Sequence, residues 1–245
     1  MRVFCCPRSY TVFRTLHSSL QRWRPAPLHL SPRECLRAAF GALLGIGITA
    51  ALCTWALGLS ADLPLLIAPM GASAVLLFAA PASPLAQPWA LLGGNLVASL
   101  VGVTCAAWIS NEIIAAALAV SVAIGLMLAL RCLHPPSGAV ALTAVLGGPS
   151  IHAAGYGFVL DPVLLNSAVL LVCALVFHTF SRHRYPHGHV PNPVAARAVS
   201  PASQQLHQAL QAVLDERDEF IDVDADDLEA IVTATLARLN QEPRR

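Results

Sequence analysis

The chain has 245 residues, of which 56% are hydrophobic and 12% charged, and its mean hydropathy is +0.63. A water-soluble domain of this length needs far more polar surface, so the composition argues against a soluble enzyme. The net charge is +1, but seven Arg residues precede residue 38 and ten of the 14 acidic residues lie from Asp215 onward.

Residues 1–35 are rich in Arg, Ser and Pro and contain one acidic residue, Glu34. This composition is typical of a basic cytoplasmic tail and of a transit peptide, and it does not separate the two. The stretch lacks the continuous apolar core of a signal peptide, and the apolar run that follows is too long to be one. We expect a basic cytoplasmic tail, with the transit peptide as the alternative.

Four apolar segments are long enough, at about 20 residues, to cross a bilayer as ordinary helices. They are residues 36–59, 89–109, 113–130 and 162–180. Between residues 38 and 180 the only formal charges are on Asp62, Glu112, Arg131 and Asp161. The pattern therefore predicts an integral membrane protein with its transmembrane domain over residues 36–180.

Two further apolar segments are interrupted by helix-breaking residues. Residues 63–80 contain Pro69 and Gly71, and residues 134–148 begin with Pro135 and Pro136. Proline has no amide hydrogen and disfavours helix in the residue before it, so each helix is expected to start at the proline. The residues that precede each proline should then be non-helical.

The two broken segments resemble each other, because PMGASA at residues 69–74 aligns without a gap on PSGAVA at residues 136–141. Each lies between longer apolar helices, and the helices that follow carry an early Asn, Asn95 and Asn166. A three-span unit repeated in tandem places its second copy upside down, as in many secondary transporters. We expect an all-α integral membrane fold of six membrane segments, arranged as two inverted three-helix repeats.

The charges agree with six crossings. The Arg residues at the N-terminus and those that follow residue 180 both belong on the cytoplasmic side, which requires an even number of crossings. Six crossings place Asp62, Glu112 and Asp161 outside and Arg131 inside. Four crossings also place both ends inside, but Arg131 and Asp62 then lie in loops that agree less well with this rule. Four crossings remain the alternative. We expect a multi-pass protein of the cell inner membrane with both termini in the cytoplasm.

After residue 180 the composition changes to His, Pro and Arg and then becomes acidic. We expect a linker over residues 181–202 and an acidic amphipathic cytoplasmic tail over residues 203–245. Helical spacing of apolar residues predicts two short helices there, the second capped by Asp226 or Asp227. The apolar positions are Leu206, Leu210, Val213, Leu214, Leu228, Ile231, Val232, Leu236 and Leu239. A solvated tail that packs on itself or on a partner chain is the simplest interpretation.

A helix that begins inside a bilayer leaves its first backbone amides without intrahelical partners, which is costly in a dry environment. Small side chains beside the two breaks would let a ligand reach those amides, and the helix dipole favours an anion. Neither break holds a carboxylate, as a bare cation would require. The candidate binding residues are Pro69, Met70, Gly71, Ala72, Ser73, Asn95, His134, Pro135, Pro136, Ser137, Gly138, Ala139 and Asn166.

These residues also have simpler explanations, since kinks are common packing devices in membrane helices. His134 is either a proton donor that couples transport or an interfacial residue bonded to backbone carbonyls. Arg131 either draws anions to the cytoplasmic mouth or only anchors its loop. Asn95 and Asn166 face a ligand or bond between helices. Two related kinks at equivalent positions favour a binding site over packing.

Several motifs resemble those of the HPP family of integral membrane proteins. They are LHPPSGA at residues 133–139, APMGASA at 68–74, GGN at 93–95 and PLAQPW at 84–89. The resemblance covers about residues 36–180, with Ser137 where the family commonly has Gly and His178 near a common Asn. It implies a small membrane protein of transport function, with chloroplast relatives associated with nitrite movement. Residues 220–230 are similar to the linker that precedes CBS domains in longer members.

We expect a membrane channel or secondary transporter for a small inorganic anion, nitrite-like by the resemblance. The alternative is a membrane anchor or sensor whose C-terminal tail recruits a cytoplasmic partner. No catalytic constellation is present in the spans, so we expect no enzyme activity, no cofactor and no metal, and the histidines at 183, 187 and 189 are expected to be solvated. The expected partners are the lipid bilayer and the anion, without nucleic acid, and a homo-oligomer is left open.

Overall fold

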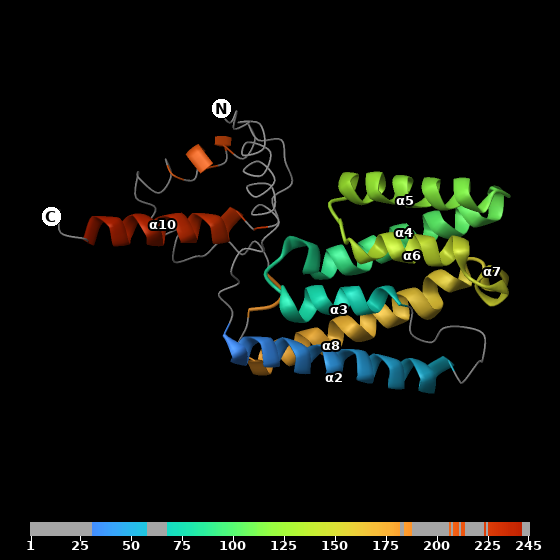
Figure 1. The fold of residues 1–245 in the computed structure, drawn as a ribbon, viewed down its shortest axis with the longest axis horizontal. Coiled ribbons are helices and arrows are strands. Elements are labelled where there is room, and N and C mark those ends of the chain that lie inside the picture. Colours follow the sequence, from blue (N-terminus) through green and yellow to red (C-terminus); the bar gives the residue numbers. More distant parts are fainter. Residues whose placement is uncertain are drawn as a thin grey trace, which may run out of the picture. The chain divides into compact units, whose positions relative to one another are not determined.

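The computed structural model of the chain consists of helices and the turns that connect them (Figure 1). It describes residues 31–57, 68–181, 184–187, 206, 208–210, 212–213, 223 and 225–241, and no strand occurs among these residues. Two units divide the chain, Met1–Cys35 and Leu36–Arg245. The elements are α2 (Pro32–Leu57), α3 (Pro69–Ala79), the 3₁₀-helix η1 (Pro84–Ala86), α4 (Pro88–Trp108), α5 (Glu112–Ala129), α6 (Pro136–Leu146), α7 (Pro149–Ala154), the π-helix η2 (Val159–Leu164), α8 (Leu165–Ser181) and α10 (Ala225–Gln241). The all-α prediction is confirmed for this part of the chain.

Among the described residues, four helices are long and apolar enough to cross a membrane, namely Pro32–Ala56, Pro88–Trp108, Glu112–Ala129 and Val159–Ser181. They coincide with the four ordinary spans predicted from the sequence. The apolar helices α3 and α6 have 11 residues each, which corresponds to about 16 Å, or roughly half of the hydrocarbon core. The six-segment inverted repeat therefore stays a prediction.

The helices α3 and α6 begin at Pro69 and Pro136, as predicted. A proline in the first helical position loses nothing by lacking an amide hydrogen, and its fixed φ suits the helix. Residues 131–135, which precede α6, are not part of a helix, and Arg131 adopts a positive φ of 54°. The expectation of non-helical backbone is nevertheless wrong for the residue directly before each proline, since Ala68 and Pro135 have helical dihedral angles. The break before α6 is therefore set by local backbone chemistry.

Three features of the helices differ from what the sequence predicts. The helix α2 begins at Pro32 and not at residue 36, because Ser31 Oγ accepts a hydrogen bond from the Glu34 amide at 3.2 Å and caps the first turn. The last span begins at Val159 and not at residue 162, with a kink at Asp161 (φ −124°, ψ 110°) inside η2. The short helix α7 was not predicted.

The structure describes part of the predicted C-terminal tail. The second predicted amphipathic helix is present as α10, on which Ile231 and Leu236 are exposed. It begins at Ala225, so the predicted cap at Asp226 or Asp227 is wrong, because both residues lie in the first turn of the helix. Residues 206, 208–210 and 212–213 of the first predicted helix are helical. Residues 1–30 and most of the 181–202 linker lie outside the described residues.

The helix α4 packs against α5, α6, η2 and α8. Its contact with α6 depends on glycine, since a Cβ atom on Gly94 would lie 2.7 Å from His134 Cβ. About two turns further along α4, a Cβ atom on Gly102 would lie 2.8 Å from the Ala141 carbonyl oxygen. Small residues of this kind let membrane helices approach backbone to backbone. The close approach brings the non-helical segment before α6 against α4.

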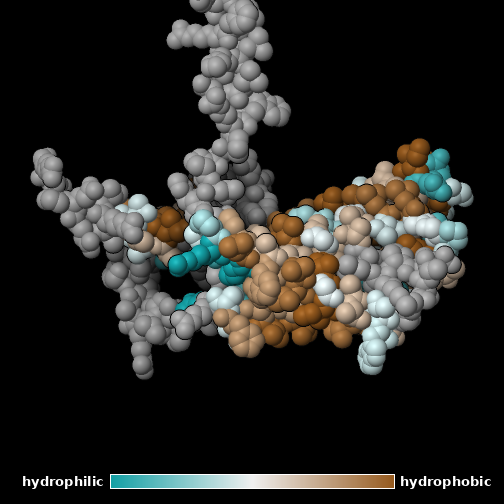
Figure 2. Space-filling view, turned by 60° about the horizontal axis from the view of Figure 1, so that its bottom comes forward, coloured by the Kyte–Doolittle hydropathy of each residue, from teal (hydrophilic) through white to brown (hydrophobic). Residues whose placement is uncertain are grey.

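The outer surface of the helices is apolar, and Figure 2 shows hydrophobic side chains over much of the visible helical face. Trp55 near the end of α2 and Trp108 at the end of α4 are 85% and 82% exposed, and Phe180 at the end of α8 is 82% exposed. Exposed aromatic residues at helix ends are typical of membrane–water interfaces. The surface therefore fits an integral membrane protein.

Candidate functional site

Five polar side chains form a cluster in the interior, which we call the polar cluster. Each has no exposed surface, although helices that surround it are among the most apolar of the chain. The members come from α3, the segment before α6, α6 itself, α4 and α8. They are Ser73, Asn95, His134, Ser137 and Ser167. Polar groups buried in such surroundings must bond to one another, because unpaired ones are costly.

His134 connects three segments of the chain. Its Nδ1 lies 2.9 Å from the Leu85 carbonyl oxygen and its Nε2 lies 2.9 Å from Ser73 Oγ. A carbonyl oxygen only accepts, so Nδ1 carries the hydrogen, and Nε2 of the neutral ring is then an acceptor for the Ser73 hydroxyl, which also lies 3.3 Å from the Pro69 carbonyl oxygen of its own helix. The imidazole thus fastens α3 and the turn at η1 to the start of α6.

Asn95 connects three helices. Ser137 Oγ of α6 donates to Asn95 Oδ1 at 2.7 Å, and Asn95 Nδ2 of α4 donates to Ser167 Oγ of α8 at 2.9 Å. Ser167 passes its own hydrogen to the Val163 carbonyl at 2.7 Å. All donors and acceptors in this chain have consistent directions, which fixes the orientation of the Asn95 amide.

The predicted binding residues divide into two faces. Pro69, Met70, Ser73, Asn95, His134, Pro136, Ser137 and Asn166 are buried; Gly71, Ala72, Pro135 and Ala139 are exposed; Gly138 is intermediate. A Cβ atom on Gly71 or Gly138 would meet no atom within 4 Å. Each short helix therefore presents one face to the polar cluster and an open small-residue face outward.

Asn95 and Asn166 do not play equivalent parts. Asn95 bonds across helices, whereas Asn166 Nδ2 donates to the Pro162 carbonyl at 2.6 Å, one turn earlier in its own segment. The Pro162 carbonyl also accepts from the Leu165 amide, just after the kink at Asp161. The structure therefore brings Asn95 into the polar cluster with Ser137 and leaves Asn166 beside it.

The expectation of unpartnered amides at the two helix starts is wrong for three residues. The Gly71 amide donates to the Ala68 carbonyl at 3.0 Å, and the Ser137 and Gly138 amides donate to the His134 and Pro135 carbonyls at 2.9 and 3.1 Å. The physical reason is that Ala68 and Pro135 already have helical dihedral angles, so each turn supplies carbonyl partners from before the helix.

Two members of the network were missed by the sequence analysis. Ser167 could have been found from its place beside Asn166 in an apolar run, since polar residues in membrane helices tend to pair. The Leu85 carbonyl carries no such signal, because a leucine side chain says nothing about its backbone oxygen. His178, whose role the resemblance left in doubt, is buried and donates from Nε2 to the Leu77 carbonyl at 2.8 Å.

Polar contacts also connect the residues after α8 to the segment around η1. Tyr185 Oη donates to the Ala86 carbonyl at 2.8 Å, and burial raises the pKa of the Tyr185 phenol. The His187 amide donates to Gln87 Oε1 at 2.8 Å. Within the described part of the chain, no group of three His, Cys, Asp or Glu residues is arranged to hold a metal ion.

Comparison with known proteins identifies relatives of this domain. The family model of the HPP transmembrane region matches residues 27–186. A transmembrane protein of Dictyostelium discoideum is 41% identical over 133 residues, which are 52% of this chain and 46% of that protein. A second transmembrane protein of the same organism is 40% identical over 126 residues, 49% of this chain and 40% of its own. The chain thus spans less than half the length of these relatives. No solved structure matches.

Proposed function

This chain belongs to the HPP family of integral membrane proteins, and from that premise we propose that it is a membrane channel or secondary transporter for a small anion. Nitrite, or an anion of similar size, is the solute that the resemblance of its motifs indicates. The proposal includes no catalytic step and no cofactor. It places the protein in a cell inner membrane with both termini in the cytoplasm.

The observation that carries the proposal is the open backbone at Gly71 and Gly138. Both residues lie in the first turn of a short apolar helix, and a Cβ atom at either would meet nothing within 4 Å. The start of a helix is its positive end, even where its amides already have local partners. A small anion that approaches there meets positive dipoles without obstruction from side chains.

The polar cluster lies on the other face of these two helices, and its composition adds no negative charge near an anion. Its side chains are Ser, Asn and His, and it contains no carboxylate. Cation sites in proteins are usually built from carboxylate and carbonyl oxygens, whereas hydroxyl, amide and imidazole groups also serve anions. Since α3 and α6 pack against each other, the two helix starts can act on one solute if they form the broken segments of inverted repeats.

The proposal is tested by anion flux into proteoliposomes that contain the purified full chain. Nitrite, nitrate, formate and chloride are compared at equal gradients, with protein-free liposomes as the blank. We expect flux of at least one small anion well above the blank. Flux of none of the four, from protein that remains folded after reconstitution, would overturn the proposal.

A second candidate function is supported by a different observation. The helix α10 exposes Ile231, at 59%, and Leu236, at 47%, which lie five positions apart and therefore about 140° apart around the helix. Exposed apolar side chains on an amphipathic helix fit a partner chain. In this alternative the transmembrane domain is a membrane anchor or a sensor, and α10 recruits a cytoplasmic protein. Loss of partner capture without loss of flux would separate the two functions.

A further inference from the structure

A groove runs along the outside of the domain between α2 and α8. Its volume is about 820 Å³, and it is lined by side chains of α2 from residue 37 to residue 52 and of α8 from residue 168 to residue 181. Both helices are candidate membrane spans. The groove therefore opens to the side, where lipid surrounds the protein.

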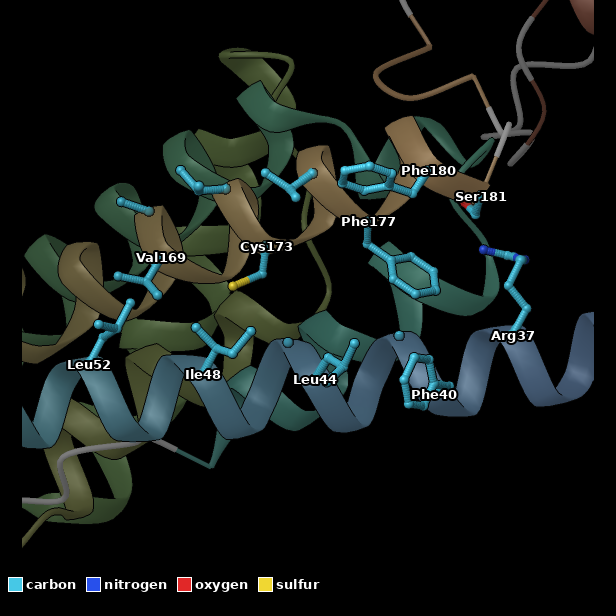
Figure 3. Close-up of a pocket in the computed structure, with 15 residues that line it drawn as sticks. Arg37, Phe40, Leu44, Ile48, Leu52, Val169, Cys173, Phe177, Phe180 and Ser181 are labelled. Atoms are coloured by element: carbon cyan, nitrogen blue, oxygen red, sulfur yellow. The ribbon is translucent and has the colours of Figure 1, made fainter.

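The walls of the groove are apolar along most of its length. Leu44, Ile48 and Leu52 follow one another at intervals of one turn on α2, and each is about 40% exposed (38%, 43% and 47%). Figure 3 shows these side chains directed toward α8, where Val169 and Cys173 face them. The part of α2 that lines the groove is about 22 Å long, against about 15 Å for the hydrocarbon of one leaflet.

One end of the groove is different, because it carries a positive charge. Arg37 and Ser181 lie there, with the exposed rings of Phe40 and Phe180 nearby (Figure 3). The Arg37 guanidinium donates to the Phe78 carbonyl at 3.2 Å, which holds the side chain at this end. An apolar channel with a guanidinium at its end is complementary to an acyl chain attached to an anionic headgroup.

We propose that this groove binds an anionic phospholipid, with one acyl chain between α2 and α8 and the headgroup phosphate at Arg37. Arginine suits a phosphate because its planar guanidinium presents several donors to the oxygens. The site does not depend on the transport function proposed above. If the N-terminus is cytoplasmic, the lipid comes from the cytoplasmic leaflet, in which anionic lipids are common.

A second copy of this chain is a less suitable occupant. Helices that pack together in membranes use small residues to bring their backbones close. The two small residues of α2 that line the groove, Gly41 and Gly45, are already used inside the domain, since a Cβ on either would lie 2.6 Å from the Phe78 ring. What remains along the groove is a series of long, half-exposed side chains, which suits a flexible chain better than a helix.

The proposal is tested with the purified full chain in detergent, titrated with phosphatidylglycerol or with phosphatidylcholine of the same acyl chains. Native mass spectrometry counts bound lipids, and thermal unfolding reports stabilisation. We expect a preference for phosphatidylglycerol of about fivefold, the factor that one basic residue near anionic headgroups contributes. The Arg37→Gln variant should lose this preference, whereas Arg131→Gln, which alters an exposed Arg elsewhere, should keep it. Equal binding of the two lipids by the unaltered protein overturns the proposal.

A second variant covers the case in which Arg37→Gln fails to fold. Val172, which lines the groove and is 57% exposed, is replaced by Trp to fill the groove without removing a charge. We expect Val172→Trp to lower the number of bound phosphatidylglycerol molecules by one, whereas Leu128→Trp on α5, at a site 53% exposed, changes nothing. If Val172→Trp instead breaks a dimer seen by light scattering and leaves lipid binding intact, the groove is an interface between copies and the lipid site is wrong.

Discussion

His134 Nε2 lies 2.9 Å from Ser73 Oγ, although the two residues are 61 positions apart in the chain. Each belongs to one of the two broken segments that the sequence marks as similar. The bond therefore ties the first broken segment to the second, at the point where each helix starts. Several measurable properties follow from this connection and from the contacts around it.

Replacing His134 by Ala should lower the free energy of unfolding in detergent by about 1–3 kcal/mol, because the Leu85 carbonyl loses its imidazole donor and the buried Ser73 hydroxyl keeps only its longer bond, 3.3 Å, to the Pro69 carbonyl. A double-mutant cycle with Ser73→Ala should show coupling of at least about 0.5 kcal/mol. Chemical unfolding monitored by circular dichroism gives these values. His152→Ala is the control, because His152 is exposed and bonds only to the Val145 carbonyl. Strictly additive effects of the two changes would contradict the bond.

Replacing Asn95 by Leu should destabilise the domain by about 0.6 kcal/mol for each bond lost, the average from double-mutant cycles on interhelical hydrogen bonds, with about 1.7 kcal/mol as the maximum for one bond. The change removes the partner of both Ser137 and Ser167. Ser99→Ala is the matched control, since the buried Ser99 hydroxyl bonds only to carbonyls of its own helix. The same unfolding assay compares the variants, and an Asn95 effect no larger than that of Ser99 would show that the interhelical bonds contribute little.

Replacing Gly71 or Gly138 by Leu should reduce anion flux severalfold while the protein still inserts and folds. The reason is that both Cβ positions point into open space, so the new side chain meets no protein atom but occupies the proposed approach to the helix start. Gly125→Leu on α5 is the control, because its Cβ position is equally open and lies outside the proposed site. If the Gly71→Leu and Gly138→Leu proteins fold and transport normally, the two helix breaks are packing kinks and not an anion site.

Topology can be measured by cysteine labelling in a background from which the seven native cysteines are removed. Six crossings predict that single cysteines at Glu112 and Asp161 react with a membrane-impermeant reagent from outside, and that one at Arg131 reacts only from the cytoplasm. All three positions are in the described part of the chain: Glu112 begins α5, Arg131 lies between α5 and α6, and Asp161 lies at the kink in η2, near the start of the last candidate span. Labelling of Asp161 from the cytoplasm would eliminate the six-segment arrangement.

Removing all residues after Arg197 should leave membrane insertion and flux unchanged. The truncation deletes α10 but none of the four candidate spans and no member of the polar cluster. Detergent gel filtration and the proteoliposome assay test the two parts of this prediction. A truncated protein that inserts and folds but carries no anion would show that the tail takes part in transport.

The parts of the fold that follow from local chemistry were predictable from the sequence. The starts of α3 and α6 come from Pro69 and Pro136, since proline favours the first helical position whatever surrounds it. The four long spans follow from uninterrupted apolar runs. Even the early start of α2 has a local signal, because Ser31 and Glu34 have the spacing of a capping pair.

The parts that depend on tertiary packing were not predictable in this way. Asn95 and Asn166 occupy comparable places in the two halves, yet one bonds across helices and the other along its own segment. The kink at Asp161 has a local cause, because Pro162 favours an extended conformation in the residue before it, but the partners that the two amides reach depend on how the helices pack around them. Similarly, the partners of His134 are fixed by how closely Gly94 lets α4 approach, which only the folded chain determines.

The exposure of Trp55 and Trp108 at helix ends makes the intrinsic fluorescence of the protein a gauge of membrane depth. Both indoles are more than four-fifths exposed, so their emission responds to whatever surrounds the protein more than to its interior. Lipids brominated at successive acyl carbons would quench each indole most strongly at its own depth, and Trp→Phe changes at the other three of the four Trp residues isolate its signal. The depth of α2 and α4 in a bilayer can therefore be measured without an attached dye.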